Sequence, residues 1–380
     1  MVELIFWTSL FLVFYVYAGY PLAVAALGVV RGRRVRKSPL TPKVTVLIAA
    51  YNEEAVIAAT VRNKLELDYP VELVEVLVIS DGSSDLTDQI VTTFNDPRVR
   101  LLRQEPRAGK TSALNHAIPH ATGEIIVFSD ANSLYAPDAL RSLIMNFADP
   151  EVGYVTGRMI YANPEGSNVG DGCTSYMKYE NALRVFETSI GSVIGVDGGI
   201  DAIRKILYVP MKVDQLPDFV LPLQVVRQGF RVVYEPMALL REEALKEVGD
   251  EYRMRVRVSL RALWAVFDMR QLLFGQGGAL FAWQLWSHKV LRYMCFLFLG
   301  AALLSNLLLL SAGLLYQVVF ALQMLSYFGA LATPIFEKAG LGFRLLAFAR
   351  YFSLLNIACA HAFGKFLLGK KQVLWVPRSG

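Results

Sequence analysis

The feature that most constrains this 380-residue chain is a pair of long segments without a charged residue, one near each end. The first, Leu4–Val30, has 27 residues, and the second, Tyr293–Phe336, has 44. One helical crossing of a bilayer needs about 20 apolar residues. The first segment therefore predicts one membrane-spanning helix, and the second predicts two, which separate at about Ser311–Gly313.

Basic residues directly after the first segment predict its orientation. They are Arg31, Arg33, Arg34, Arg36 and Lys37. The positive-inside rule assigns such a cluster to the cytoplasm, so the N-terminus is expected outside and the middle of the chain inside. A cleaved signal peptide is the alternative, but no basic region precedes the segment, which is also longer than the apolar core of such a peptide.

A weaker apolar segment covers residues 345–368 and contains Arg350 and His361. Ionisable residues inside an apolar segment indicate either a site between membrane helices or an interfacial helix. A third crossing would place the tail outside, whereas basic residues in the tail favour the inside. These are Lys370, Lys371 and Arg378. The side of the tail stays open at this level.

The roughly 250 residues between the apolar ends are enough for one large domain or two smaller ones. With 54% hydrophobic and 19% charged residues, the composition excludes a disordered chain and disfavours a soluble enzyme. The basic cluster lacks the interleaved aromatic residues of a nucleic-acid surface, so no nucleic-acid partner is expected. Three cysteines, Cys173, Cys295 and Cys359, suit a reducing compartment better than a disulfide framework.

The middle region alternates between strand-like and helix-like segments. Val44–Ala50 is a continuous β-branched run, apolar on both faces, as in a central parallel strand. Strand patterns recur at residues 73–79, 99–102 and 124–129, and helical patterns at 53–67, 85–94 and 111–121. This alternation predicts a doubly wound α/β sheet with right-handed crossovers, in which ligands bind beyond the carboxyl ends of the strands.

Polar residues follow three of these strands directly. The groups are Tyr51-Asn-Glu53-Glu54, Asp81-Gly-Ser-Ser-Asp85 and Asp130-Ala-Asn132. Each alone could be a helix cap, but together they predict a ligand site at one edge of the sheet. The Asp130-x-Asn132 spacing offers oxygen ligands for Mg²⁺ or Mn²⁺ bridging phosphates. Lys110, at the head of the third helix, would add positive charge there, unless it is a solvated lysine at a helix start.

Three other kinds of site find no support in the sequence. Gly109-Lys110-Thr111 suggests a P-loop, but that loop needs a glycine where Gln104 stands. His116 and His120 are four residues apart, but Pro119 interrupts the helix, so both are interpreted as structural. No Gly-x-Ser-x-Gly elbow or Cys/His arrangement is present for acyl chemistry.

The strand-end motifs resemble, in order, those of the family 2 inverting glycosyltransferases of the GT-A fold. The resemblance covers about Pro42 to Leu263 and is strongest to the membrane-bound branch with the hyaluronan, chitin and cellulose synthases. The motifs that carry it are Val44–Glu54, Ser80–Asp85, Gly109-Lys110 with Ala113–Asn115, and Ser129–Asn132. It implies a Rossmann-like mixed sheet, a nucleotide diphosphate sugar donor, usually UDP-linked, and a divalent metal.

The resemblance also implies a role for each residue at the strand ends. The residues implied in donor binding are Ala50, Tyr51 and Glu53 at the nucleoside pocket, Asp81 at the base and Lys110 at the diphosphate. Asp130 would hold the metal. Asn132 replaces the usual second aspartate, and its amide can ligate through oxygen but adds no charge.

Two downstream motifs resemble the acceptor segment and the catalytic base of the family. The acceptor segment is Val196–Arg204, with Asp197, Gly198, Gly199 and Arg204 as the implied binding residues. Its alternative is a turn followed by a helix. Asp218 resembles the base that takes the proton of the acceptor hydroxyl. The alternatives are an N-cap role for Asp218 and a base role for Asp214.

Tyr252–Phe267 predicts an amphipathic helix with a stripe of arginines, Arg253, Arg257 and Arg261. The stripe would lie at a membrane surface, where it could attract anionic headgroups or a lipid diphosphate, or else it would be solvated. Arg257 aligns with the arginine of the Gln-x-x-Arg-Trp motif of processive relatives, which implies donor binding. Met254 and Val258 replace the Gln and Trp, which disfavours processive synthesis.

The sequence therefore predicts a multi-pass inner-membrane glycosyltransferase with a cytoplasmic catalytic domain and a polyprenyl-diphosphate-linked glycan as acceptor. The expected regions are an anchor with its basic flank (1–37), a GT-A domain (38–250), interface helices (251–290), and two or three membrane helices with a tail (291–380). The alternatives are a processive synthase that extrudes its polymer, a non-catalytic component that binds a nucleotide sugar, and, more distantly, a nucleotidyltransferase.

Overall fold

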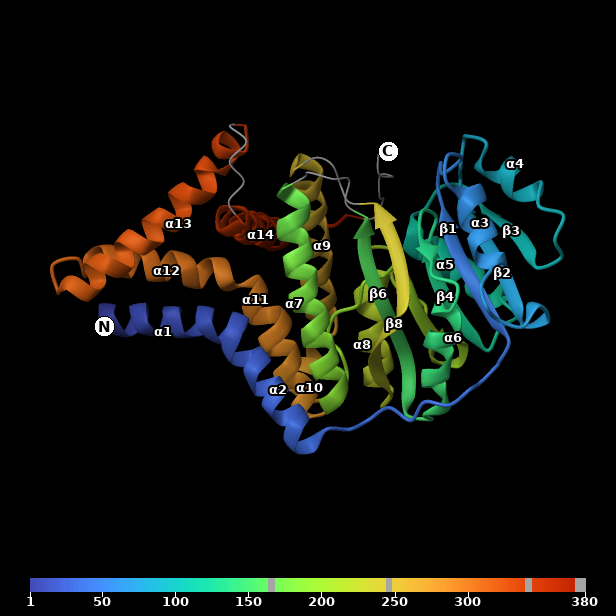
Figure 1. Ribbon diagram of the computed structural model, residues 1–380, viewed down its shortest axis with the longest axis horizontal. Coiled ribbons are helices and arrows are strands. Elements are labelled where there is room, and N and C mark those ends of the chain that lie inside the picture. Colours follow the sequence, from blue (N-terminus) through green and yellow to red (C-terminus); the bar gives the residue numbers. More distant parts are fainter. Residues whose placement is uncertain (163–167, 244–247, 339–343, 373–380) are drawn as a thin grey trace.

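The computed structural model describes residues 1–162, 168–243, 248–338 and 344–372, arranged as Figure 1 shows. Residues 373–380, including Arg378 of the basic tail, lie outside the described part. The centre of the protein is an eight-stranded sheet with the order β3-β2-β1-β4-β7-β6-β8-β5. Its strands are β1 (Val44–Ala50), β2 (Val74–Asp81), β3 (Val99–Gln104), β4 (Ile125–Asp130), β5 (Leu134–Tyr135), β6 (Val152–Ala162), β7 (Ile200–Arg204) and β8 (Arg231–Glu243).

The sheet is mixed, as predicted. β1 pairs in parallel with both β2 and β4, and β2 pairs in parallel with β3. This half of the sheet is the one that the strand-helix alternation in the sequence indicated. β7 is antiparallel to both β4 and β6, whereas β6 and β8 are parallel to each other.

Helices cover both faces of the sheet, which explains why β1 is buried along its whole length. Successive side chains of a strand point to opposite faces, so Val46 and Ile48 enter one core while Leu47 and Ala49 enter the other. The first core is covered by α3 (Ile57–Leu65), α4 (Thr87–Thr92) and α6 (Ala139–Ile144). The second is covered by α5 (Lys110–Ala117), α8 (Pro217–Arg227), α9 (Val248–Asp268) and α10 (Ala279–Leu285).

Three helices are shorter than the sequence pattern predicted. The helix expected at 53–67 is α3, and the Glu53 N–H before it donates to Thr87 Oγ1 at 2.8 Å, which holds that stretch against the start of α4. The helix expected at 85–94 begins at Thr87, because Asp85 accepts a hydrogen bond from the Thr87 N–H at 3.0 Å. The helix expected at 111–121 ends at Ala117, where Pro119 contributes to a separate 3₁₀ turn.

Three described helical segments are long and apolar enough to cross a membrane, by length and composition. They are Val2–Arg31, Leu314–Phe336 and Leu345–Leu367, and a pair bent by 58°, Ala279–Tyr293 with Cys295–Leu308, would be a fourth. The elements concerned are α1 (Val2–Phe14), α2 (Tyr20–Arg31), α11 (Leu291–Tyr293), α12 (Cys295–Leu308), α13 (Leu314–Lys338) and α14 (Arg344–Leu367). The predicted break at Ser311–Gly313 falls between α12 and α13, which confirms it. In Figure 1, α1, α12 and α13 lie away from the sheet, with α7 (Asn168–Ile190) and α9 between them and the sheet.

The helix with the arginine stripe, α9, packs along α14. Val256 and Leu260 of α9 meet Ala358 and Ala362 of α14 in one buried cluster. The contact continues into the tail, where the indole N–H of Trp264 donates to the carbonyl of Lys370 at 2.9 Å. The described start of the tail therefore lies beside α9, on the side of the sheet domain.

Arg261 contradicts both interpretations of the arginine stripe. Only 7% of it is exposed, so this part of the stripe lies neither at a membrane surface nor in solvent. Its guanidinium donates to Thr111 Oγ1 at 3.2 Å and to the carbonyl of Gln215. The cause is tertiary, because the neighbouring Ala262 and Ala265 belong to the core beneath the sheet and turn this face of α9 inward.

Candidate functional site

The strand ends singled out by the sequence meet at one edge of the sheet. Ala49 of β1 pairs with Asp130 at the end of β4, and β2, beside β1, ends at Asp81. β7 runs antiparallel to β4, so its first residue, Ile200, pairs with Ser129. The turn that precedes β7 therefore reaches the same edge. This register brings the predicted donor and acceptor segments together.

Lys110 and Asp130 form an ion pair at this edge, with 2.5 Å between Nζ and Oδ1. The side chain of Lys110 is 22% exposed and that of Asp130 is 36% exposed. Burial lowers the pKa of a lysine, but the negative charges of Asp130, Asp218 and Asp201 outweigh it and raise the pKa of Lys110 above its ordinary value. The site thus holds a permanent cation next to carboxylates, as a phosphate and metal site requires.

Asp81 is fully buried and holds the loop that leads into α5. Its carboxylate accepts hydrogen bonds from Gln104 Nε2 at 2.6 Å, the Ala108 N–H at 2.8 Å and the Gly109 N–H at 2.9 Å. Because Lys110 follows directly, Asp81 fixes where Lys110 begins its helix. Sequence reasoning missed this role because the three donors lie 23 to 28 residues further along the chain.

Tyr51 and Arg107 form a flat cationic surface beyond the end of β1. The guanidinium carbon of Arg107 lies 3.4 Å from the centre of the Tyr51 ring. Such a stack can offer a nucleobase or phosphate both an aromatic face and a positive charge. Ala50 is buried as the last residue of β1, and Glu53 follows Tyr51 at the same edge. The donor-binding roles of Ala50, Tyr51 and Glu53 remain predictions, and Arg107 joins them.

The residues around Asp130 fit a divalent cation. Asn132 Nδ2 donates to Glu242 Oε1 at 3.3 Å, from the end of β8. This bond orients the amide and leaves its oxygen available as a ligand. No group of three or more His, Cys, Asp or Glu side chains that could hold a metal occurs among the described residues. The phosphates of a donor are therefore expected to complete the coordination, as they do for Mg²⁺ in many nucleotide sites.

The predicted acceptor segment forms the turn before β7. Arg184 of α7 holds Asp197 through two bonds, of 2.6 Å to Oδ1 and 2.7 Å to Oδ2. Gly198 has φ +84°, and a Cβ built there would lie 2.5 Å from Cγ of Asp218. Gly199 accepts a hydrogen bond from the Tyr135 hydroxyl at 2.9 Å. A strand follows this turn, so the alternative of a turn followed by a helix is wrong.

Replacing Gly198 with Ala is expected to reduce the predicted sugar transfer at least tenfold, because the new Cβ would displace the Asp218 carboxylate. Gly229→Ala is the matched control, since Gly229 has a similar φ of +87° with no atom within 4 Å of a built Cβ. Both variants should lose about 1 kcal/mol of stability through backbone strain. Transfer rates and melting temperatures, measured side by side, separate the two effects. Equal transfer losses in both variants would contradict the placement of Asp218.

Asp218 is the second residue of α8 and makes no capping bond. The N-cap of α8 is Leu216, and no side chain caps this helix, so the N-cap alternative is wrong. Within the described ranges, no hydrogen bond or ion pair engages the Asp218 carboxylate. Asp214 differs, because it pairs with Lys371 of the tail. Burial would raise the pKa of Asp214, but the Lys371 ammonium outweighs it and lowers the pKa, which makes Asp214 the poorer base.

Asp201 is a second buried carboxyl group at this edge, one that sequence reasoning did not single out. Neither of its carboxylate oxygens has a hydrogen-bond partner in the described part of the chain. Burial raises the pKa of Asp201 from 3.8 to about 8; the hydroxyls of Thr156 and Tyr154 oppose this rise, and repulsion from Asp218 and Asp197 adds to it. A buried carboxyl group without partners is most stable when protonated.

Asp201→Asn is expected to raise the melting temperature near pH 8. The folded protein holds a proton on Asp201 that the unfolded chain loses above about pH 4, so stability falls as pH rises from about 4 to 8. Each unit of pKa shift corresponds to about 1.4 kcal/mol. Melting temperatures of parent and variant at several pH values between 5 and 8 test this. Parallel curves for the two proteins would show that Asp201 does not carry the pH dependence.

Arg204 is not brought into the cluster. Arg204 ends β7 opposite Ile125, at the far edge of the sheet. Its guanidinium donates to the carbonyls of Val152 at 2.8 Å and Phe147 at 2.7 Å. The acceptor role predicted for Arg204 is therefore corrected to a structural one, because the antiparallel direction of β7 carries it away from the site. Arg257 lies partly buried on α9, one turn before Arg261, and its donor role stays a prediction.

Comparisons with known proteins agree with this geometry. The family model described as "Glycosyl transferase family 2" matches residues 45–249. A beta-monoglucosyldiacylglycerol synthase of Trichormus variabilis is 34% identical over 192 residues, which cover 48% of this chain and 41% of that protein. A poly-beta-1,6-N-acetyl-D-glucosamine synthase of Staphylococcus aureus is 31% identical over 222 residues, which cover 56% and 53%. The chain thus spans about half the length of these relatives.

A solved structure shares the fold over nearly the whole chain. It is that of the mannosyltransferase PcManGT from Pyrobaculum calidifontis, in complex with GDP-Man and Mn²⁺. The TM-score is 0.74 at 23% identity, over 97% of this chain and 100% of the other. The predicted α/β fold is therefore confirmed. Because the family model matches more than half of its residues, the chain belongs to glycosyl transferase family 2.

Proposed function

We propose that the protein is a membrane-bound inverting glycosyltransferase that moves a sugar from a nucleotide diphosphate donor to a glycan linked to a polyprenyl diphosphate. The observation that carries the proposal is that Lys110, Asp130 and Asp218 lie together at one edge of the sheet. Lys110 pairs with Asp130, and the negative charges of both aspartates raise its pKa. The complex of the similar mannosyltransferase with GDP-Man and Mn²⁺ supports such a donor and metal. The names of the curated relatives, a glycolipid synthase and a polysaccharide synthase, support a membrane acceptor.

Asp218 is the general base of the proposed reaction. Its carboxylate takes the proton of the acceptor hydroxyl while that oxygen attacks the anomeric carbon of the donor sugar. The bond from the anomeric carbon to the diphosphate oxygen breaks, its electron pair leaves with the nucleotide diphosphate, and the configuration inverts. Lys110 offsets the charge that develops on the leaving group. Mg²⁺ or Mn²⁺, bound by Asp130 and Asn132, would neutralise part of that charge.

The membrane arrangement is part of the proposal. The proposed regions are an anchor (1–37), a GT-A domain (38–250), interface helices (251–290) and a membrane region (291–380). The GT-A domain lies on the cytoplasmic side of the inner membrane. Lys371 pairs with Asp214 of the domain, which supports a tail on the same side. Two crossings, by α12 and α13, would return the chain to that side. α14, packed along α9, would then be the interfacial helix that the sequence allowed.

Release of nucleotide by the purified chain in detergent tests this function. A panel of UDP- and GDP-sugars, each with Mg²⁺ or Mn²⁺, is offered with and without a polyprenyl-diphosphate-linked acceptor. Metal-dependent release from one donor is expected, with a UDP-sugar as the first to try. If no donor reacts and free UDP does not bind, the assignment fails. UDP binding without any turnover would favour the non-catalytic alternative, and a ladder of long products would favour the processive one.

A further inference from the structure

Lys289 is a cation without a partner beside the acceptor segment. It lies in the π-helical turn Trp286–Val290, between α10 and α11. A Cβ built on Gly195 would lie 2.7 Å from Lys289 Nζ, so the ammonium rests against the start of that segment. Nζ also lies 5.5 Å from the centre of the ring of Phe219, the residue after Asp218. In the chain as described, Lys289 makes no hydrogen bond or ion pair.

Two buried carboxylates, Glu180 and Glu187, act on the charge of Lys289, but both are already engaged by other groups. Glu187 is fully buried and accepts a hydrogen bond from the Tyr20 hydroxyl at 2.6 Å. His288 Nδ1 lies 2.7 Å from the same oxygen, and the Ile194 N–H bonds the other at 3.1 Å. A partly buried ammonium without a paired anion is costly. Binding of an external anion would therefore stabilise the ammonium of Lys289.

Arg292 offers a second cationic nitrogen next to Lys289. It follows three residues later, across the junction of the π-helical turn with α11, and its positive charge acts on Lys289. Its Nη1 donates to Glu180 Oε1 at 2.5 Å. Its Nη2 is buried and has no hydrogen-bond partner among the residues that the structure describes. Together with Lys289 Nζ, this nitrogen suits an anion with several oxygens, such as a phosphate.

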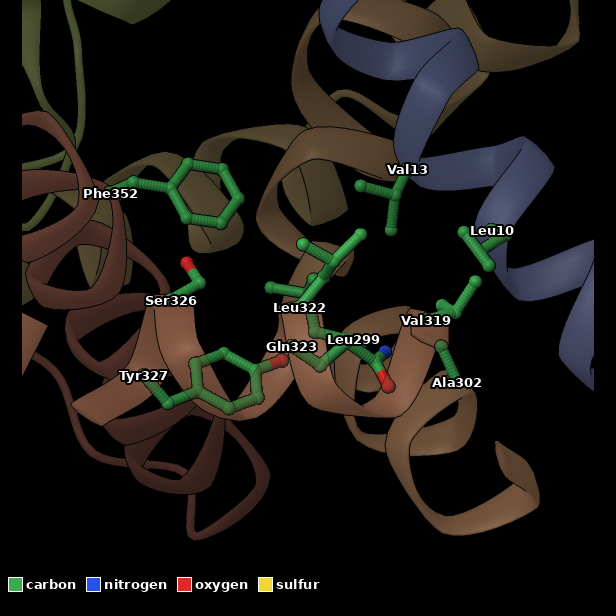
Figure 2. A pocket seen from close by; sticks show the side chains of 10 residues that line it. All are labelled: Leu10, Val13, Leu299, Ala302, Val319, Leu322, Gln323, Ser326, Tyr327 and Phe352. Carbon is green, nitrogen blue, oxygen red and sulfur yellow. The ribbon is translucent and has the colours of Figure 1, made fainter. Parts of the chain in front are cut away.

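An apolar cavity lies among the apolar helices from the two ends of the chain, as Figure 2 shows. Its volume is about 270 Å³, and side chains of α1, α12, α13 and α14 line it. One of the lining side chains, that of Phe352, packs on Tyr17 with 5.2 Å between ring centres. The guanidinium of Arg292 lies 5.5 Å from the centre of the Tyr17 ring. The helices α1, α12 and α13 that line the cavity lie away from the sheet in Figure 1, so it is not the donor site, and Tyr17 connects its wall to the guanidinium of Arg292.

We propose that Lys289 and Arg292 bind the phosphate of a lipid-linked acceptor, and that the first part of its hydrocarbon chain occupies the cavity of Figure 2. This inference rests on the proposed function, because it needs an acceptor hydroxyl at Asp218. The positive charges of Lys289 and Arg292 favour a phosphate, and the apolar lining of the cavity favours a hydrocarbon chain. A phosphate attached to a lipid therefore fits better than free phosphate. Lys289 Nζ lies 5.5 Å from the centre of the Phe219 ring, and Phe219 follows Asp218 in α8, so the phosphate would bind on the side of the site where α8 begins.

Binding measurements on the full chain in nanodiscs test the inference without any sugar transfer. The probes are farnesyl phosphate, farnesol and inorganic phosphate. The parent should bind farnesyl phosphate more tightly than either of the others. Lys289→Met should weaken farnesyl phosphate binding about tenfold or more, as expected for a lost charged hydrogen bond, and leave farnesol binding unchanged. Lys289→Arg, which keeps the charge, should retain most of the affinity.

Two further variants sharpen the test. Gly195→Ala should weaken farnesyl phosphate binding as well, because its Cβ occupies the place of the Lys289 ammonium. Lys178→Met removes an exposed lysine of α7 and is the matched control for unspecific charge attraction. It should change the affinity less than twofold.

Equal affinity of the parent and Lys289→Met for farnesyl phosphate would overturn the phosphate site. Equally tight binding of farnesol, or of inorganic phosphate, by the parent would overturn the combined lipid-phosphate site. The proposed function is judged separately, by nucleotide release and transfer in the parent. If the parent transfers sugar but Lys289→Met binds the lipid phosphate as tightly as the parent does, the phosphate site is wrong and the proposed function still holds.

Discussion

Asp218→Asn is expected to abolish sugar transfer while leaving the donor bound. An amide has the shape of the carboxylate but cannot take a proton from the acceptor, and loss of a general base typically costs about 10²- to 10⁴-fold in rate. α8 should be unaffected, because the Asp218 side chain does not cap it. The transfer rate at saturating donor and metal, with the affinity for UDP from a separate titration, gives both quantities.

Asp214→Asn is the matched control for this base assignment. Asp214 lies four residues earlier but is paired with Lys371, which lowers its pKa. Its replacement should reduce transfer far less than that of Asp218. If Asp214→Asn shows the deeper loss, the base role passes to Asp214. If neither variant differs from the parent, general base catalysis at this edge is wrong.

Asp130→Ala is expected to remove both metal-dependent donor binding and transfer. The variant deletes the carboxylate at the end of β4 that also pairs with Lys110. A metal that neutralises diphosphate charge is worth several kcal/mol, so transfer should fall about 10³-fold. Binding of Mn²⁺ in the presence of UDP, followed by electron paramagnetic resonance, gives a readout besides activity.

Asp138→Ala provides the comparison for Asp130. Asp138 is exposed, and its side chain makes no capping bond at α6, so its loss should leave Mn²⁺ binding within twofold of the parent. Mn²⁺ binding by Asp130→Ala at the parent's affinity would place the metal elsewhere. In that case Asp130 would serve only as the counter-ion of Lys110.

The local pattern of the sequence determined the parallel half of the sheet. The continuous apolar run Val44–Ala50 can be buried on both faces only between two helical layers, and β1 is buried throughout. Because the carboxyl ends of parallel strands meet at one edge, the polar residues after them could be assigned to one site. Lys110 and Asp130 meet there at 2.5 Å, as that reasoning required.

Helix lengths and the arginine stripe could not be obtained from local patterns. Thr87 binds the chain before α3 from 34 residues away, and helical periodicity carries no information about such a partner. Arg261 looked like part of a polar surface stripe, yet it is buried against Thr111 and Gln215. Periodicity shows that a helix has two faces, but it does not show what covers each of them.

The sequence by itself determined the family, the strand ends that carry the site and the apolar segments at both ends of the chain, because each depends on residues close together in the sequence. Only the tertiary structure decided that Arg204 lies at the far edge of the sheet, that Asp218 rests against Gly198, and that Lys289 has no hydrogen bond or ion pair with the described residues. These depend on strand direction and on contacts between distant segments. Burial in three dimensions, which sets the energetic cost of an unpaired charge, is not encoded in any single stretch of the chain.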